Sequence, residues 1–143
     1  MPQQKITACA FIHKDGKLFL PRRAATKSFL PNKFELPGGH IEYREDIIEG
    51  LRREIREELS LEVIIGDPLF AFTYMNDSQH CHSIEVDYFV QFADPNPVIH
   101  LHPEDHSEYR WVTQAEAKEL LGEDDDEYKA IKRGFEILED KQR

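Results

Sequence analysis

The chain has 143 residues, and its 40% hydrophobic content is enough for one sizeable core, which predicts a single domain over residues 1–143. With 28 acidic and 18 basic residues, the formal net charge is −10, which excludes a protein that holds a nucleic-acid backbone by bulk charge. Residues 1–38 differ, because they hold seven Lys or Arg and two Asp or Glu, a local charge of +5. An anionic ligand therefore needs a metal ion or this basic region.

The two cysteines, Cys9 and Cys81, form neither a disulfide framework nor a CxxC metal motif. We expect both to be buried or inert thiols in a reducing compartment. No apolar run in the sequence approaches the roughly 20 residues that a membrane-spanning helix needs. The N-terminus also lacks the long apolar segment of a signal peptide. These features predict a soluble cytoplasmic protein with no membrane partner.

The first part of the chain is expected to form a β-hairpin and a loop. Asp15 and Gly16 are a turn signal between two β-prone runs, which predicts antiparallel strands. Gly38 and Gly39 predict a sharp turn, because glycine adopts backbone conformations that other residues avoid. The expected segments are a strand at 6–13, a strand at 18–20, a loop at 21–33 and an extended stretch at 34–37.

A helix is predicted from Ile47 to about Leu59. Asp46 is placed to accept a hydrogen bond from a free backbone N–H, and Glu49 to reach back to the start of the helix. An apolar stripe at helical spacing is made of Ile48, Leu51, Ile55 and Leu59. Gly50 costs up to about 1 kcal/mol relative to Ala inside a helix, which indicates close packing there.

The second half predicts further strands and two closing helices, with no repeat and no linker. Strands are expected at 61–65, 69–75, 84–92 and 108–112, and a helix at 113–121. The last helix has an apolar face made of Tyr128, Ile131, Phe135 and Leu138. Residues 122–126 predict an acidic loop, and we interpret the run 123–127 as solvated rather than as a second metal site.

Three carboxylates, Glu54, Glu57 and Glu58, share one flank of the predicted helix. Like charges at this spacing repel by tenths of a kcal/mol per pair, and a divalent cation among them offsets the repulsion. A hard cation such as Mg²⁺ or Mn²⁺ takes oxygen ligands, polarises a phosphoryl oxygen and activates a bound water. A backbone carbonyl of Gly38 or Gly39 is a further candidate ligand. The pattern suits pyrophosphate cleavage.

Residues 39–61, GHIEYREDIIEGLRREIREELSL, resemble the signature of the Nudix hydrolases, the MutT-related family. The matching positions are Gly39, Glu45, Arg53, Glu54, Ile55, Glu57, Glu58 and Leu61. The preceding FELPG segment, residues 34–38, is similar to the family's lead-in. The resemblance implies the Nudix fold, an α/β fold in which a mixed β-sheet is sandwiched between α-helices.

The resemblance also implies roles for individual residues. It makes Glu54, Glu57 and Glu58 the metal-binding set, with the carbonyl of Gly38 or Gly39 nearby. The pair formed by Glu45 and Arg53 matches the family's structural ion pair, which fastens the preceding loop to the helix, although in some members the matching Glu also reaches the metal.

The general base differs among family members. Glu54 is our first candidate, and Glu104 or Asp105, in the loop before the last expected strand, is an additional acid to consider. A basic loop that often helps to hold substrate phosphates in the family is matched by Arg22 and Arg23, with Lys27 and Lys33, although a plain charged surface is the alternative.

Two positions depart from the family pattern. Arg44 stands where the family usually has Gly, and it either contacts a substrate phosphate or lies on the surface. Ser60 replaces the Gly that usually ends the helix in a left-handed conformation. No metal ligand is lost at either position.

Other chemistry-bearing residues carry less weight. Neighbouring strand residues point to opposite faces, so the His-Cys-His segment 80–82 is disfavoured as a soft-metal site. Aromatic side chains are mostly expected in the core, and Phe34, Tyr74 and Tyr109 are candidates for stacking on a base.

We therefore predict a Mg²⁺- or Mn²⁺-dependent Nudix pyrophosphohydrolase that cleaves the diphosphate of a nucleoside diphosphate linked to another group. Nucleoside triphosphates, nucleotide sugars and dinucleoside polyphosphates all fit, with selection by the loops 21–33, 75–83 and 93–107. A non-catalytic Nudix-like module that senses a nucleotide or binds a partner is one alternative, disfavoured because all motif acids are present. An RNA 5′ pyrophosphohydrolase is another, disfavoured by the acid excess. A homodimer is an open option, since relatives often dimerise.

Overall fold

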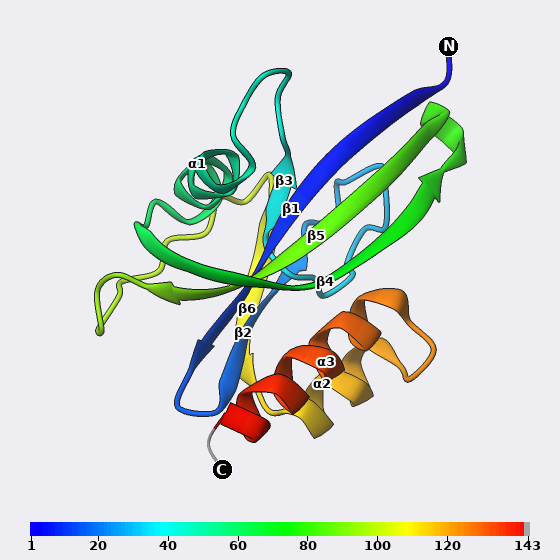
Figure 1. The fold of residues 1–143 in the computed structure, drawn as a ribbon. Coiled ribbons are helices and arrows are strands. Elements are labelled where there is room, and N and C mark those ends of the chain that lie inside the picture. The colour runs from blue at the N-terminus through cyan, green and yellow to red at the C-terminus, as the bar shows by residue number, and fades with distance from the viewer. Residues whose placement is uncertain (142–143) are drawn as a thin grey trace.

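Six strands, three α-helices and one short 3-10 helix make up residues 1–141, which the computed structural model describes. In chain order they are β1 (Gln3–Lys14), β2 (Lys17–Arg23), β3 (Gly38–His40), α1 (Ile47–Leu59), β4 (Val63–Asn76), η1 (Asp77–Gln79), β5 (Cys81–Phe92), β6 (His106–Val112), α2 (Gln114–Leu121) and α3 (Asp126–Lys141). In Figure 1, α1 covers one face of the sheet, and α2 and α3 cover the other. The predicted fold class is confirmed. None of the helices within residues 1–141 is long and apolar enough to span a bilayer.

Strand β1 lies at the centre of a mixed sheet. It runs parallel to β5 and antiparallel to β2 and β3, and the strand order is β4-β5-β1-β2-β6 with β3 beside β1. The β1–β2 hairpin confirms the predicted turn, because Asp15 and Gly16 have φ values of 52° and 76°, as two-residue hairpin turns require. β1 therefore anchors both halves of the chain.

Side chains along β1 alternate between the two faces of the sheet, which divides the core into two layers. Phe11 packs with Phe89 and Phe135 on the face covered by α2 and α3. Ile12 packs on the opposite face, with the α1 stripe residues Leu51, Ile55 and Leu59. Because both faces are buried, the helices are held at fixed positions over the sheet.

Helix α1 spans the residues predicted for it. Asp46 accepts hydrogen bonds from the backbone N–H groups of Ile48 and Glu49, as expected of an N-cap. The predicted return contact from Glu49 was wrong, because its side chain lies 3.5 Å from Arg52 instead. The close packing predicted at Gly50 is confirmed: a Cβ atom there would lie 2.6 Å from Ile41 Cδ1.

The sharp turn predicted at Gly38 and Gly39 was wrong, because both residues belong to β3 and pair with β1. Glycine is required at position 38 for a different reason. Its φ is +152°, and a Cβ atom would overlap the carbonyl oxygen of Ala8 and lie 2.7 Å from Cys9 Cα. Glycine here allows two strands to approach closely.

Three further expectations were corrected by long-range contacts. The strands predicted at 61–65 and 69–75 are one strand, β4, whose pairing with β5 shifts register around Pro68. The loop predicted at 21–33 begins only after β2. Glu127, expected in a solvated acidic run, is 9% exposed and accepts a hydrogen bond from the backbone N–H of Leu36.

Ser60 ends α1 with φ 57°, in the left-handed conformation that favours glycine. Ser60→Gly should therefore raise the free energy of unfolding in urea by about 0.5–1 kcal/mol, because glycine adopts this conformation without strain. Ser107→Gly, at an exposed position in β6, is the control and should lower stability, because glycine weakens a strand. A Ser60→Gly protein no more stable than the wild type would contradict the left-handed conformation assigned to Ser60.

Candidate catalytic site

The motif glutamates of α1 reach the backbone of β3. The Glu54 carboxylate lies over Gly39, where a Cβ atom would come within 2.9 Å of Glu54 Oε1 and closer still to its other carboxyl atoms. Glu58 accepts a hydrogen bond from the backbone of Gly38. The two glycines thus leave room for carboxylates against a bare strand.

Arg53 organises the exposed side of this site. Its Nε and Nη2 donate to the two carboxylate oxygens of Glu45 at 2.7 and 2.9 Å, so the ion pair expected from the resemblance forms. Its Nη1 donates to Glu54 Oε1 at 3.0 Å and to Glu57 at 3.2 Å. The Arg53 guanidinium lowers the pKa of Glu45 to about 2, so this carboxylate stays charged and ties the loop to α1.

Glu58 is the most enclosed of the motif acids, with its side chain 12% exposed. Burial raises the pKa of Glu58 well above its ordinary value, and the charges of Glu35, Glu54 and Asp105 raise it further. Burial also raises the pKa of Glu54, although Arg53 opposes the shift. Glu58 Oε2 is buried with no hydrogen-bond partner, so this oxygen lacks a donor or a cation.

Sequence reasoning did not single out Glu35 and His106, which complete this side of the site. His106, buried at the start of β6, donates from Nε2 to Glu35 Oε2 at 3.0 Å. Its Nδ1 lies 3.8 Å from Glu58 Oε2. Arg23 donates to the other oxygen of Glu35 at 3.0 Å. Glu35 sits in the lead-in segment and could have been found there, whereas His106 carried no sequence signal.

The other predicted site residues are spread out. Arg23 faces the site, but Arg22 pairs with Glu108 at 3.4 Å and lies over the ring of Phe34. Asp105 pairs with Lys27 at 3.1 Å, and its negative charge helps to raise the pKa of Glu58. Glu104 is exposed. Arg44 is exposed too, with φ 68°, which explains why glycine is usual at its position.

A cavity of about 580 Å³ adjoins the motif and extends between the sheet and the start of α3. Gly38, Gly39 and Glu35 line the end nearest the motif. Tyr74 lines another wall and stacks on Phe29, with ring centroids 6.0 Å apart. Of the other stacking candidates, Phe34 is buried in the core, and Tyr109 lines a separate cavity.

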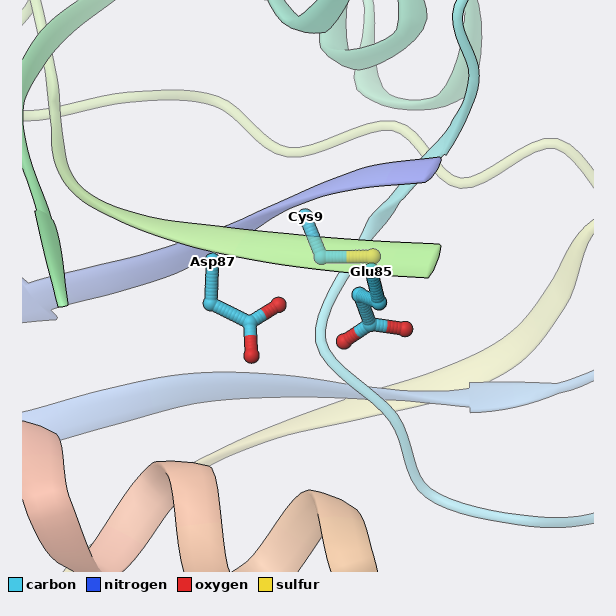
Figure 2. Close-up of side chains that lie close together, drawn as sticks. All are labelled: Cys9, Glu85 and Asp87. Atoms are coloured by element: carbon cyan, nitrogen blue, oxygen red, sulfur yellow. The ribbon is translucent and has the colours of Figure 1, made fainter. Parts of the chain in front are cut away.

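A thiol and two acids meet on the sheet face that bears this cavity (Figure 2). Cys9, Glu85 and Asp87 are all buried, as predicted for the cysteine. Burial raises the pKa of all three groups, that of Asp87 to about 7. Sequence reasoning missed the two acids, although acids two residues apart in a β-rich run are a signal that both face one side.

Within residues 1–141, Cys9, Glu85 and Asp87 are the group of three side chains whose potential metal-ligand atoms lie within 4.8 Å of one another. The glutamates predicted to bind metal, Glu54 and Glu57 with Glu58, do not converge as tightly. Arg53 binds the carboxylates of Glu54 and Glu57, whereas Glu58 has no contact with it among the hydrogen bonds of residues 1–141.

A family model described as the NUDIX domain matches residues 2–133, and the chain belongs to this family. Nucleoside triphosphatase NudI from Salmonella arizonae is 37% identical over 75 residues, which cover 52% of this chain and 52% of NudI. The match thus spans about half the length of the curated relative.

Solved structures share the fold at lower identity. The MutT protein from Methanosarcina mazei Go1 has a TM-score of 0.77 at 22% identity, covering 99% of this chain and 97% of that one. The C. elegans Ap4A hydrolase in a binary complex has a TM-score of 0.74 at 15% identity, covering 96% and 98%. At such identities the likeness concerns the fold alone.

Asp87 should make stability depend on pH. Because its folded-state pKa is about 7 against an ordinary value of 3.8, the folded protein keeps a proton that the unfolded chain releases between these pH values. Its contribution to stability therefore falls as the pH rises through this range. Asp87→Asn should gain nothing over the wild type in unfolding free energy below about pH 4, and on the order of 4 kcal/mol at about pH 8, since one pKa unit is about 1.4 kcal/mol.

Urea unfolding with EDTA present measures this difference. Asp67→Asn, at an exposed position, is the matched control and should show no such pH-dependent gain. If Asp87→Asn raised the free energy of unfolding equally at acidic and alkaline pH, this would contradict the raised pKa of Asp87.

Proposed function

We propose that this protein is a divalent-metal-dependent pyrophosphohydrolase that cleaves the diphosphate of a small nucleotide. The observation that carries the proposal is the placement of Glu54 and Glu58 against the bare backbone of Gly38 and Gly39, beside a cavity of about 580 Å³. Acids and cavity together suit a substrate whose diphosphate lies at the motif and whose nucleoside enters the cavity.

The residues fit a hard cation. Glu58 Oε2 is a buried oxygen without a partner, and the Glu54 carboxylate occupies the space that a side chain at Gly39 would fill. Glu54, Glu57 and Glu58, with a carbonyl of Gly38 or Gly39, would hold Mg²⁺ or Mn²⁺. The bound ion would polarise a phosphoryl oxygen and lower the pKa of a bound water.

The chain's own side chains supply position and proton transfer. Glu54 is the candidate general base, because burial raises its pKa towards the range in which a carboxylate accepts a proton effectively. Arg53, fixed by Glu45, keeps Glu54 and Glu57 on the same side of α1. His106 and Arg23 hold Glu35 from two sides and stiffen the wall behind Glu58.

The relatives support an enzyme acting on nucleotides. NudI is named a nucleoside triphosphatase, and one fold neighbour is an Ap4A hydrolase, which together favour the polyphosphate substrates predicted from sequence. The aromatic wall at Tyr74 and Phe29 suits the base of such a substrate. Two free, buried thiols suit the reducing cytoplasm as the compartment.

Purified protein with Mg²⁺ should release phosphate, pyrophosphate or a nucleoside monophosphate from at least one member of a panel of nucleoside triphosphates, nucleotide sugars and dinucleoside polyphosphates. Glu57→Gln and Glu58→Gln should each lower kcat by on the order of 100-fold, because each removes a metal-ligand charge. Circular dichroism should show the fold unchanged.

Glu49→Gln is the matched control on the same helix, since the Glu49 side chain is 66% exposed and pairs with Arg52. Its kcat should remain within about twofold of the wild type. No turnover of any panel member, or an equal loss in the control, would count against the proposal.

A further inference from the structure

Cys9, Glu85 and Asp87 are brought together by strand pairing alone. Glu85 and Asp87 are two residues apart on β5, so they face the same side of the sheet. In the parallel pairing of β1 with β5, Cys9 lies opposite Asp87. Figure 2 shows the three side chains leaving the same face of the sheet. They lie on the face opposite α1, so they are separate from the motif glutamates.

The hydrogen bonding of this cluster is incomplete. Glu85 lies within hydrogen-bonding reach of Cys9 and Asp87, yet Glu85 Oε2 and both carboxylate oxygens of Asp87 are buried with no other partner. A proton shared between the two acids would satisfy one oxygen of each and leave the third oxygen alone. Buried polar atoms are rarely left in this state. A cation among the three side chains would contact both acids and the sulfur at once.

No cationic side chain is paired with the cluster. Among the ion pairs formed within residues 1–141, none involves Glu85 or Asp87. Lys33, which lines the adjoining cavity, is paired with Asp125 at 2.8 Å and with Glu127 at 3.8 Å. A buried carboxylate that stays charged normally has an ionic partner or coordinates a metal. With residue exposures of 4% for Glu85 and 0% for Asp87, bulk water does not replace that partner.

We propose that Cys9, Glu85 and Asp87 form a second metal site, which takes a divalent transition-metal ion with a preference for Zn²⁺. Their ligand atoms already lie within 4.8 Å of one another. One thiolate and two carboxylates suit Zn²⁺, whereas Mg²⁺ prefers oxygen ligands alone. On binding, the thiol and any protonated carboxyl release their protons to solvent.

The site is reachable from outside. Cys9 and Glu85 line the cavity of about 580 Å³, so an ion can enter through it. Three protein ligands leave a fourth position of a tetrahedral ion, which water from the cavity fills. This site does not depend on the proposed hydrolase activity, because its ligands come from β1 and β5 rather than from α1.

Cobalt titration of the metal-free full-length protein tests the site, with Co²⁺ as a spectroscopic substitute for Zn²⁺. The wild type should bind one equivalent with a near-ultraviolet thiolate-to-cobalt absorption band, which Zn²⁺ displaces. Zn²⁺ should also raise the Tm, because it binds only the folded state. Cys9→Ser should abolish the band, and Asp87→Asn should weaken Co²⁺ binding at least tenfold while the metal-free protein stays folded.

Two control variants separate this site from other metal binding. Cys81→Ser removes the other buried thiol, and Glu57→Gln removes a motif acid, so both proteins should keep the band. A wild type without the band, a Cys9→Ser protein that retains it, or an Asp87→Asn protein with undiminished Co²⁺ affinity would each overturn the proposal.

Discussion

The close approach of β3 to both β1 and α1 is the constraint on which the candidate catalytic site depends. Gly38 has no room for a Cβ atom beside Ala8, and Gly39 has none beside Glu54. On the helix side, a side chain at Gly50 would meet the carboxylate of Glu45, which Arg53 holds. Small residues at these contacts let the glutamates of α1 touch strand backbone instead of solvent. The raised pKa values of Glu54 and Glu58 thus follow from packing, because enclosed carboxylates lose hydration.

Local signals could be predicted, whereas contacts between distant segments could not. Helix α1 was predicted to its ends because Asp46 and the apolar stripe lie within the segment itself. The continuity of β4 through Pro68 depends on its pairing with β5, which no local pattern reveals. His106 lies beside Glu58 although the two residues are far apart in the sequence. Only their proximity in space reveals that His106 belongs to the site.

The basic N-terminal region acquires a more specific meaning from the structure. Arg23 pairs with Glu35, Lys27 with Asp105, and Lys33 with Asp125. These cations line the cavity already bound to acids, so they reduce its negative charge instead of forming a free positive surface. The cavity lining also includes Glu85, Asp126 and Glu127, so acids outnumber these cations there.

The parallel pairing of β1 with β5 also sets an order of assembly. Strands β1 and β2 form a hairpin from neighbouring residues, but the parallel partner of β1 begins only at Cys81, about half of the chain length further on. Closing such a long loop is slow compared with forming a hairpin. During synthesis, one edge of β1 therefore stays unpaired until β5 has emerged from the ribosome. Glu85 and Asp87 of β5 become buried only after this pairing, and the core layer around Phe11 is complete only once α2 and α3, which follow β5 in the chain, are in place.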